Sequence, residues 1–239
     1  MRVLDLFCGE GGAGYGYHLA GATVVGIDLD PQRRYPFQFF SCSALSLRVE
    51  FLRLFDLIHA SPPCQFGSEM RHAPGARDKR HENLIPATRA MLQDAGVPYV
   101  IENVRAVARA GHLIAPVALD GRMFGNRMTT STGETFWLSR ERFFETSWGM
   151  IPPAAWQSAA GPIANVFGGH LRCRSGEHRT GGDTGRTREF VGEDKPALAR
   201  ALMGMPWATM RGMSEAVPPS YTAFIGAQFA SIVGQRAAA

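Results

Sequence analysis

The 239-residue sequence has few cysteines, few lysines and no long apolar run. Without a run of about 20 apolar residues, a membrane-spanning helix is not expected. The N-terminal stretch MRVLDLFCGE contains an acid at position 5 and no cleavable apolar region, so we do not expect export. We expect a cytoplasmic protein and a monomer. Its four cysteines, at positions 8, 42, 64 and 173, are then expected to be free thiols.

Lysine is also scarce, because only Lys79 and Lys195 are present and arginine supplies the rest of the 25 basic residues. The formal net charge is +4 and the pI is about 9.1. Guanidinium groups suit phosphate and base contacts, but GC-rich coding would give the same bias. Charge alone therefore does not establish a nucleic-acid partner.

Short apolar runs alternate with helical segments, which predicts a doubly wound, mostly parallel α/β sheet. The predicted strands are VLDLF (3–7), TVVGI (23–27), DLIHA (56–60) and YVIE (99–102). The predicted helices are 12–20, 31–40, 81–95, 195–205 and 220–235. The last helix has Ile225, Phe229, Ile232 and Val233 on one face, which we expect to pack onto the sheet.

A polar or glycine-rich cluster follows each predicted strand, and we expect the four clusters to converge on one cleft. The first fits GxGxxG from Gly9 to Gly14, and Asp28 follows the next strand. This pattern occurs in dinucleotide-binding loops, in loops that bind S-adenosylmethionine and in structural tight turns. Phe7 could stack on an adenine, and no second set of strands for a nicotinamide is visible. Both points favour S-adenosylmethionine.

Cys64 stands directly after two prolines in SPPCQ. Pro62 and Pro63 fix φ and bias the residue before each of them toward extended geometry, which makes a rigid arm. A nucleophile benefits from such mounting, whereas a small apolar filler, the alternative interpretation, does not need it. Glu102 ends the neighbouring apolar run, where partial desolvation would raise its pKa and make it a proton donor. A strand-end salt bridge is the alternative for Glu102.

Residues 150–195 differ in composition from the rest and are predicted to be a short, loop-rich insertion, with 1–149 and 196–239 forming the main domain. Five arginines could reach phosphates or guanine edges: Arg172, Arg174, Arg179, Arg186 and Arg188. His170, Cys173 and His178 fall short of a usual zinc set, and we predict no metal.

The segments DLFCGEGG, SPPCQ and ENV, in this order, resemble the signature segments of the cytosine-5 DNA methyltransferases. SRERFFET (139–146) resembles the family's arginine-x-arginine element, and SEAVPPSYTAFIG (214–226) resembles its closing segment. The resemblance covers nearly the whole chain except 150–195. It is greatest to the compact enzymes of bacteriophages and actinobacteria. It implies a bacterial cell or a phage-infected host, double-stranded DNA as substrate, and a target-recognition role for 150–195.

The resemblance also implies roles for the site residues. Cys64 would add to C6 of a flipped-out cytosine, and Glu102 would hold N3 and the 4-amino group. Asn103 would brace the loop that carries Cys64, and Arg142, with Arg140, would hold the base O2 or a phosphate. Segment 66–80 would form a lid. C5 would then take a methyl group from S-adenosylmethionine, leaving S-adenosylhomocysteine.

The cofactor contacts are implied in the same way. Phe7, Gly9 and Gly11 would line the methionine and adenine region, Asp28 would take the ribose hydroxyls, and Leu29 and Leu84 would flank the adenine. Ser43 stands where the family usually has an acid that accepts from the adenine amino group. A serine hydroxyl accepts more weakly, so altered cofactor selection stays open.

Three alternatives remain. The substrate could be RNA, since the chemistry would be the same. The protein could be a non-catalytic DNA-binding relative, a reading that the serine at position 43 motivates. The glycine loop could also belong to a nicotinamide oxidoreductase.

Overall fold

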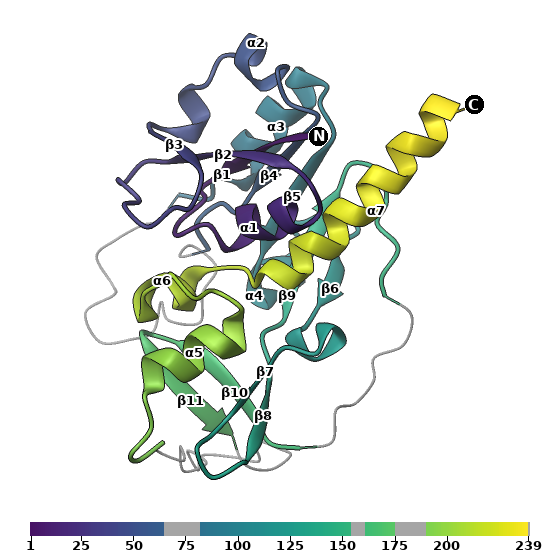
Figure 1. The fold of residues 1–239 in the computed structure, drawn as a ribbon. Coiled ribbons are helices and arrows are strands. Elements are labelled where there is room, and N and C mark those ends of the chain that lie inside the picture. The colour runs from purple at the N-terminus through teal and green to yellow at the C-terminus, as the bar shows by residue number, and fades with distance from the viewer. Residues whose placement is uncertain (65–81, 154–160, 175–189, 239) are drawn as a thin grey trace.

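A computed structural model describes residues 1–64, 82–153, 161–174 and 190–238 (Figure 1). Eleven strands are formed in these ranges: β1 Arg2–Leu6, β2 Thr23–Asp28, β3 Gln38–Ser41, β4 Leu57–Ala60, β5 Tyr99–Asn103, β6 Val117–Leu119, β7 Arg127–Thr129, β8 Thr135–Leu138, β9 Arg142–Thr146, β10 Ile163–Phe167 and β11 His170–Arg174. The α-helices are α1 Gly12–Leu19, α2 Val49–Leu52, α3 Ile85–Ala95, α4 Arg105–Arg109, α5 Lys195–Met203, α6 Met210–Glu215 and α7 Pro219–Ala238. Two 3₁₀ helices, η1 Ala44–Ser46 and η3 Gly121–Phe124, complete the description.

Seven strands form the main sheet in the order β3-β2-β1-β4-β5-β9-β6. The first five are parallel, and β9 runs antiparallel to both β5 and β6. The predicted doubly wound, mostly parallel sheet is therefore confirmed. Strand order reverses between β1 and β4, and at such a point the carboxyl ends of the strands leave a crevice.

Helices cover both faces of this sheet, because its central strands are apolar on both sides. Val3 and Val100 face a core that α1 and α7 close with Tyr17, Ile225 and Phe229. On the other face, Leu4, Leu6 and Ile58 pack with side chains from α2, α3 and α4. The carboxyl ends of β1, β2, β4 and β5 therefore lie along one edge of a rigid three-layer body.

A second sheet, of order β11-β10-β8-β7, forms the lower part of the molecule in Figure 1. We predicted loops over 168–190, but β10 and β11 form a hairpin around Gly168 and Gly169. Both glycines have positive φ, 58° and 77°, as the two-residue turn of a tight hairpin requires. Alternate residues on the two strands point inward and pack with α5 and α6. This sheet takes strands from both sides of the predicted boundary at residue 150.

The predicted helix at 31–40 is wrong. Pro31 and Pro36 lack the N–H that a helix requires, and the segment instead ends in the short edge strand β3. The predicted helices at 12–20, 81–95 and 195–205 correspond to α1, α3 and α5.

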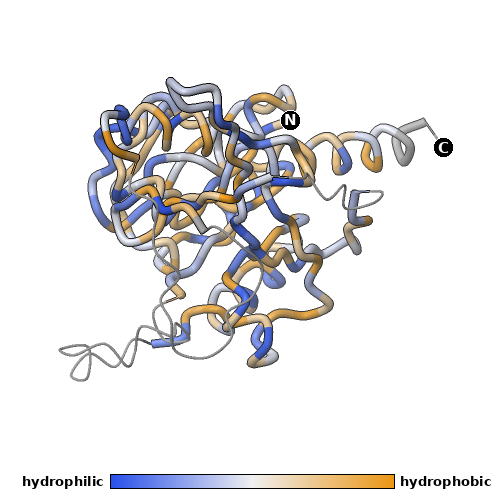
Figure 2. The backbone as a smooth tube through the Cα atoms, turned by 90° about the horizontal axis from the view of Figure 1, so that it is seen from below, coloured by the Kyte–Doolittle hydropathy of each residue, from blue (hydrophilic) through white to orange (hydrophobic). Residues whose placement is uncertain are grey.

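Helix α7 matches the predicted C-terminal helix in position, but only its first part is buried. Ile225 and Phe229 lie in the core, whereas Val233 is 47% exposed. The last turns carry both apolar and polar residues and project from the body (Figures 1 and 2). Within the described ranges, no helix is long and apolar enough to cross a membrane.

Candidate active site

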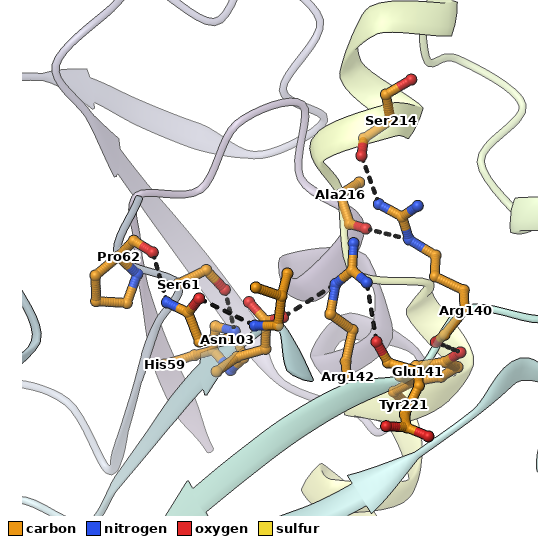
Figure 3. A network of polar contacts seen from close by, with 12 residues as sticks. His59, Ser61, Pro62, Asn103, Arg140, Glu141, Arg142, Ser214, Ala216 and Tyr221 are labelled. Atoms are coloured by element: carbon orange, nitrogen blue, oxygen red, sulfur yellow. Dashed lines mark hydrogen bonds and ion pairs between the residues drawn. The ribbon is translucent and has the colours of Figure 1, made fainter. Parts of the chain in front are cut away.

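The segment that carries Cys64 leaves the sheet at the end of β4 and is tied to the next strand. The Asn103 side chain, at the end of β5, donates from Nδ2 to the carbonyl of Pro62 at 2.9 Å (Figure 3). Asn103 is 2% exposed and also accepts from the backbone N–H of Val104 through Oδ1. Two hydrogen bonds, the one to Pro62 buried and the one from Val104 partly buried, therefore fix the amide, and the amide holds the proline arm in front of Cys64.

Glu102 lies beside Asn103 and faces Arg142 of the antiparallel strand β9. The Nε atom of Arg142 is 3.2 Å from Oε1 of Glu102, and both side chains are largely buried. Burial raises the pKa of Glu102 above its ordinary value, while Arg142 and a hydrogen bond from Ser61 lower it in part. The predicted upward shift of the Glu102 pKa is thus present, together with the salt bridge that was its alternative.

The charges of Glu102 and Arg142 both change the pKa of Cys64. Burial raises the pKa of its thiol, and the charge of Glu102 raises it further, while Arg142 and Arg140 act in the opposite direction. The thiol is therefore mostly protonated at neutral pH in the free protein. The structure therefore places Cys64 within electrostatic range of the Glu102–Arg142 pair.

Arg140 does not point toward this group. Its guanidinium is buried at 2% exposure and donates to four acceptors on other elements. These are the carbonyls of Ala216 at 3.0 Å, Val166 at 2.8 Å and Ser214 at 2.7 Å, and Oδ1 of Asn165 at 3.3 Å. The expected contact of Arg140 with a base or phosphate is corrected accordingly: Arg140 joins β10 to the segment around α6.

Two polar residues that the sequence analysis did not single out, His59 and Ser61, are linked to Glu102. His59, in the middle of the buried strand β4, contacts the Tyr17 hydroxyl through Nδ1 at 3.0 Å. Its Nε2 contacts the Ser61 hydroxyl, also at 3.0 Å (Figure 3). Burial lowers the pKa of His59 to about 3, so the imidazole is neutral. A histidine inside an otherwise apolar strand was the available signal.

The glycine loop has two different kinds of glycine. Gly9 has φ +50° and open space where a Cβ would lie, so its surroundings are free for a ligand. A Cβ on Gly11 would instead meet Tyr35 and Pro36 at under 3 Å, and one on Gly14 would meet Tyr35 and Asp5. Gly11 is therefore needed to make room for the Tyr35 side chain, a packing role that differs from the cofactor contact expected of it.

The glycine loop also packs against Tyr35, which is bonded to Asp5 of β1, and is hydrogen-bonded to residues 207–209 before α6. The Tyr35 hydroxyl donates to Oδ2 of the buried Asp5 at 3.1 Å. The Glu10 carboxylate accepts from Thr209 N at 2.7 Å and Thr209 Oγ1 at 2.6 Å, and the Glu10 carbonyl accepts from the Trp207 indole at 2.7 Å. Neither Tyr35 nor Glu10 was predicted.

The other cofactor candidates lie at the same sheet edge. Asp28 ends β2 and accepts from the N–H groups of Gly9 at 2.9 Å and Asp30 at 3.1 Å, which leaves further lone pairs on both oxygens. Phe7 adopts a positive φ of 57°, unusual for a residue with a side chain. Leu29 is 71% exposed, Ser43 follows the adjacent strand β3, and Leu84 is half-buried at the start of α3.

Several predicted features lie outside the described residues. These are the lid at 66–80, and Arg179, Arg186, Arg188 and His178 of the recognition segment. In the ranges that are described, no group of three or more His, Cys, Asp or Glu residues could hold a metal. Arg172 lies over the Phe167 ring, 5.8 Å from its centroid, on the hairpin.

Residues 1–113 match the family model of the C-5 cytosine-specific DNA methylases. Over these residues the chain is similar to the C-5 cytosine-specific DNA methylases. The matched part includes the glycine loop, Cys64, Glu102 and Asn103. No curated protein matches the chain significantly.

Solved structures show the same fold over nearly the full length of this chain. A protein described as a DNA modification methyltransferase encoded within an E. coli prophage is 13% identical, with a TM-score of 0.58 and coverage of 98% of this chain and 99% of that one. A DNMT2 mutant from Spodoptera frugiperda is 12% identical (TM-score 0.58; coverage 94% and 98%). S. pombe Dnmt2 is 12% identical (TM-score 0.56; coverage 97% and 99%).

The family and the fold imply S-adenosylmethionine as cofactor, and the residues at the sheet edge fit such a group. The space at Gly9 admits a ligand next to the backbone, and Asp28 offers acceptors for hydroxyl groups. Leu29 and Phe40, exposed at 71% and 46%, offer apolar surface for a base.

Proposed function

We propose that this protein transfers a methyl group from S-adenosylmethionine to C5 of cytosine in double-stranded DNA, through a covalent adduct between Cys64 and C6 of a flipped-out base. The observation that carries the proposal is the convergence of Cys64, Glu102 and Arg142 at the end of adjacent strands, where each charge shifts the pKa of the thiol. Such coupled, partly desolvated groups are typical of catalytic sites.

The chemistry follows from these groups. Cytosine C5 is a poor nucleophile, and the addition of a thiolate to C6 makes it an enamine carbon. The Cys64 thiol is protonated at rest, so its proton must leave as the S–C6 bond forms. The Glu102 carboxylate, whose pKa burial raises, is suited to take up this proton and pass it to N3, where charge develops. Arg142 keeps the carboxyl in place and balances its charge while it is ionised.

The remaining roles are proposed on the same basis. Phe7, Gly9, Asp28 and Leu29 would hold S-adenosylmethionine, which would supply the methyl group for C5. Loss of the C5 proton and breakage of the S–C6 bond then restore the ring and the thiol. Asn103 keeps the Pro62–Cys64 arm rigid, so that the sulfur meets C6 in one orientation. Ser43 and Leu84 complete the adenine surroundings.

We further propose that the second sheet, including 163–174 from the predicted insertion, contacts the DNA. Its hairpin presents Arg172 and the 48% exposed Phe167, a pair suited to phosphate and base contact. Extrusion of a base costs roughly a few kcal/mol, which these contacts would offset. The protein would act on its DNA as a monomer.

The proposal predicts a covalent complex. Duplex DNA containing 5-fluorocytosine cannot lose a proton from C5, so with S-adenosylmethionine it should become fixed to Cys64. Cys64→Ala should form no complex and should lower methyl transfer by about 10³-fold or more. Cys42→Ala, which removes another half-buried thiol, should leave both unchanged. Peptide mapping identifies the attached residue.

Labelled methyl transfer to duplex DNA and to RNA separates the possible substrates. Transfer to DNA alone, or mainly to DNA, is expected. Equal or greater transfer to RNA would replace the substrate class, and binding of DNA without any transfer would identify a non-catalytic relative.

A further inference from the structure

A chain of buried polar groups runs from α1 to the carboxyl of Glu102. It begins at the Tyr17 hydroxyl, passes through His59 on β4 and the Ser61 hydroxyl, and ends at Glu102. Tyr17 and His59 are fully buried, and Glu102 is 6% exposed. Tyr17 lies on α1, His59 on β4 and Glu102 on β5. Ser61 directly follows β4, and its N–H donates to the Leu6 carbonyl of β1 at 3.2 Å, which holds this residue in place.

The direction of the hydrogen bonds follows from which groups must donate. Burial raises the pKa of Tyr17 well above its usual value, so it stays a phenol whose O–H needs an acceptor. Nδ1 of the neutral His59 is that acceptor, which leaves the ring proton on Nε2. Nε2–H then donates to the Ser61 oxygen. The Ser61 hydroxyl hydrogen is consequently directed away from His59, and it donates to Glu102.

We propose that His59 and Ser61 are positioning residues for Glu102, with Tyr17 fixing the tautomer of His59 so that the Ser61 hydroxyl always donates to the carboxyl. This inference rests on the proposed function in one respect, namely that Glu102 acts on the cytosine ring. Glu102 is then held from two sides, by Ser61 from the end of β4 and by Arg142 from β9. The Glu102 carboxyl is therefore already oriented in the free protein, before a base binds.

Other charged groups that act on Glu102 are Arg142 and Arg140, and Glu102 in turn acts on Cys64. None of them changes when the Ser61 hydroxyl is removed. The loss of that donor therefore has a defined sign: Ser61→Ala should raise the pKa of Glu102, because the hydrogen bond stabilises the carboxylate.

The test combines a measurement on the free protein with kinetics. In ¹⁵N spectra, His59 should be neutral from pH 5 to 9 with its proton on Nε2, and Tyr17→Phe should shift the population toward the other tautomer. In ¹³C spectra, Ser61→Ala should move the Glu102 titration upward by about half a unit or more. Ser147→Ala is the matched control, since Ser147 bonds to the opposite end of β5 through the Tyr99 N–H at 2.9 Å.

In methyl-transfer assays, Ser61→Ala should lower kcat at least fivefold and move the acidic limb of the pH profile upward, with little change in KM for DNA. His59→Leu should act similarly, and His59→Gln should restore activity, because an amide can accept from Tyr17 and donate to Ser61. If His59→Leu does not fold, Ser61→Ala and Tyr17→Phe carry the test.

A proton on Nδ1 of His59 in the wild type, or a Glu102 titration equal in Ser61→Ala and Ser147→Ala, would overturn the proposal. A wild type that transfers no methyl group would overturn the proposed function, and the spectra of the free protein would still decide the network.

Discussion

At the scale of single residues, the pKa of the Cys64 thiol depends on the charge of the neighbouring Glu102 carboxyl. The charge of Glu102 raises the pKa of Cys64, so the same carboxyl that is proposed to act on the base also keeps the nucleophile protonated in the free protein. Arg142 and Arg140 reduce this effect without removing it. Thiolate formation is therefore expected only as C6 approaches.

Glu102→Gln should consequently change two properties in opposite directions. Without the carboxylate, the pKa of Cys64 falls and alkylation by iodoacetamide at pH 8 should accelerate, by up to about tenfold for a shift of one pKa unit. Methyl transfer should fall by about 10²-fold or more, because the proton donor is lost. Alkylation is followed by mass spectrometry, with Cys64→Ala as background for the other thiols. An unchanged alkylation rate would show that the two groups are not coupled.

Asp5, below the glycine loop, makes stability depend on pH. Burial raises the pKa of Asp5 from 3.8 to about 8, although Tyr35 donates to it. The folded protein then holds a proton that the unfolded chain releases, so this contribution to stability is highest at acidic pH and falls as the pH rises from about 4 to about 8.

Asp5→Asn should remove this dependence while keeping an acceptor for Tyr35. The variant should gain stability relative to the wild type between pH 6 and pH 9, by at most about 1.4 kcal/mol per pH unit below the pKa. Urea unfolding at the two pH values measures the difference. An equal change in unfolding free energy between the two pH values for both proteins would contradict the raised pKa of Asp5.

At the scale of elements, the buried apolar strands of the main sheet were predictable and the strands of the second sheet were not. DLIHA and YVIE are apolar because helices cover both faces of their sheet, and their polar ends indicated Cys64 and Glu102. Strands β7 and β8 have three and four residues, and their pairing depends on contacts distant in sequence. The β10–β11 hairpin had a local signal, the Gly168–Gly169 turn between alternating runs, which arginine-rich composition obscured. The direction of Arg140 depends on the partner carbonyls and could not be inferred from sequence.

Arg140 connects these elements, so its replacement tests how the second sheet is held. Arg140→Lys keeps the charge, but an ammonium cannot reach four acceptors that surround a planar guanidinium. Stability should fall by about 2–4 kcal/mol in urea unfolding. Arg211→Lys, on the exposed face of α6, should change stability by less than about 0.5 kcal/mol. Equal effects of the two changes would remove Arg140 from its proposed role.

At the scale of the whole molecule, the two sheets meet the glycine loop through a few contacts. The segment that enters α6 crosses the loop, where Thr209 and Trp207 bond to Glu10. The cofactor edge of the main sheet is therefore attached to the body that we propose contacts DNA. Sequence analysis could not show this, because 197 positions separate the two bonded residues Glu10 and Trp207.

Glu10→Ala should weaken cofactor binding although Glu10 is not proposed to touch the cofactor. Gly9 and Asp28 would lose the support of the neighbouring clamp, and the loop would have to be ordered during binding, which raises the Kd for S-adenosylmethionine by about five- to tenfold. Asp194→Ala is the matched control, since it removes an N-cap bond of 3.0 Å to Ala197 at the start of α5 and leaves the loop intact. Both variants should lose about 1 kcal/mol of stability, but only Glu10→Ala should change the Kd measured by calorimetry. An equal Kd in both variants would mean that the loop is rigid without the clamp.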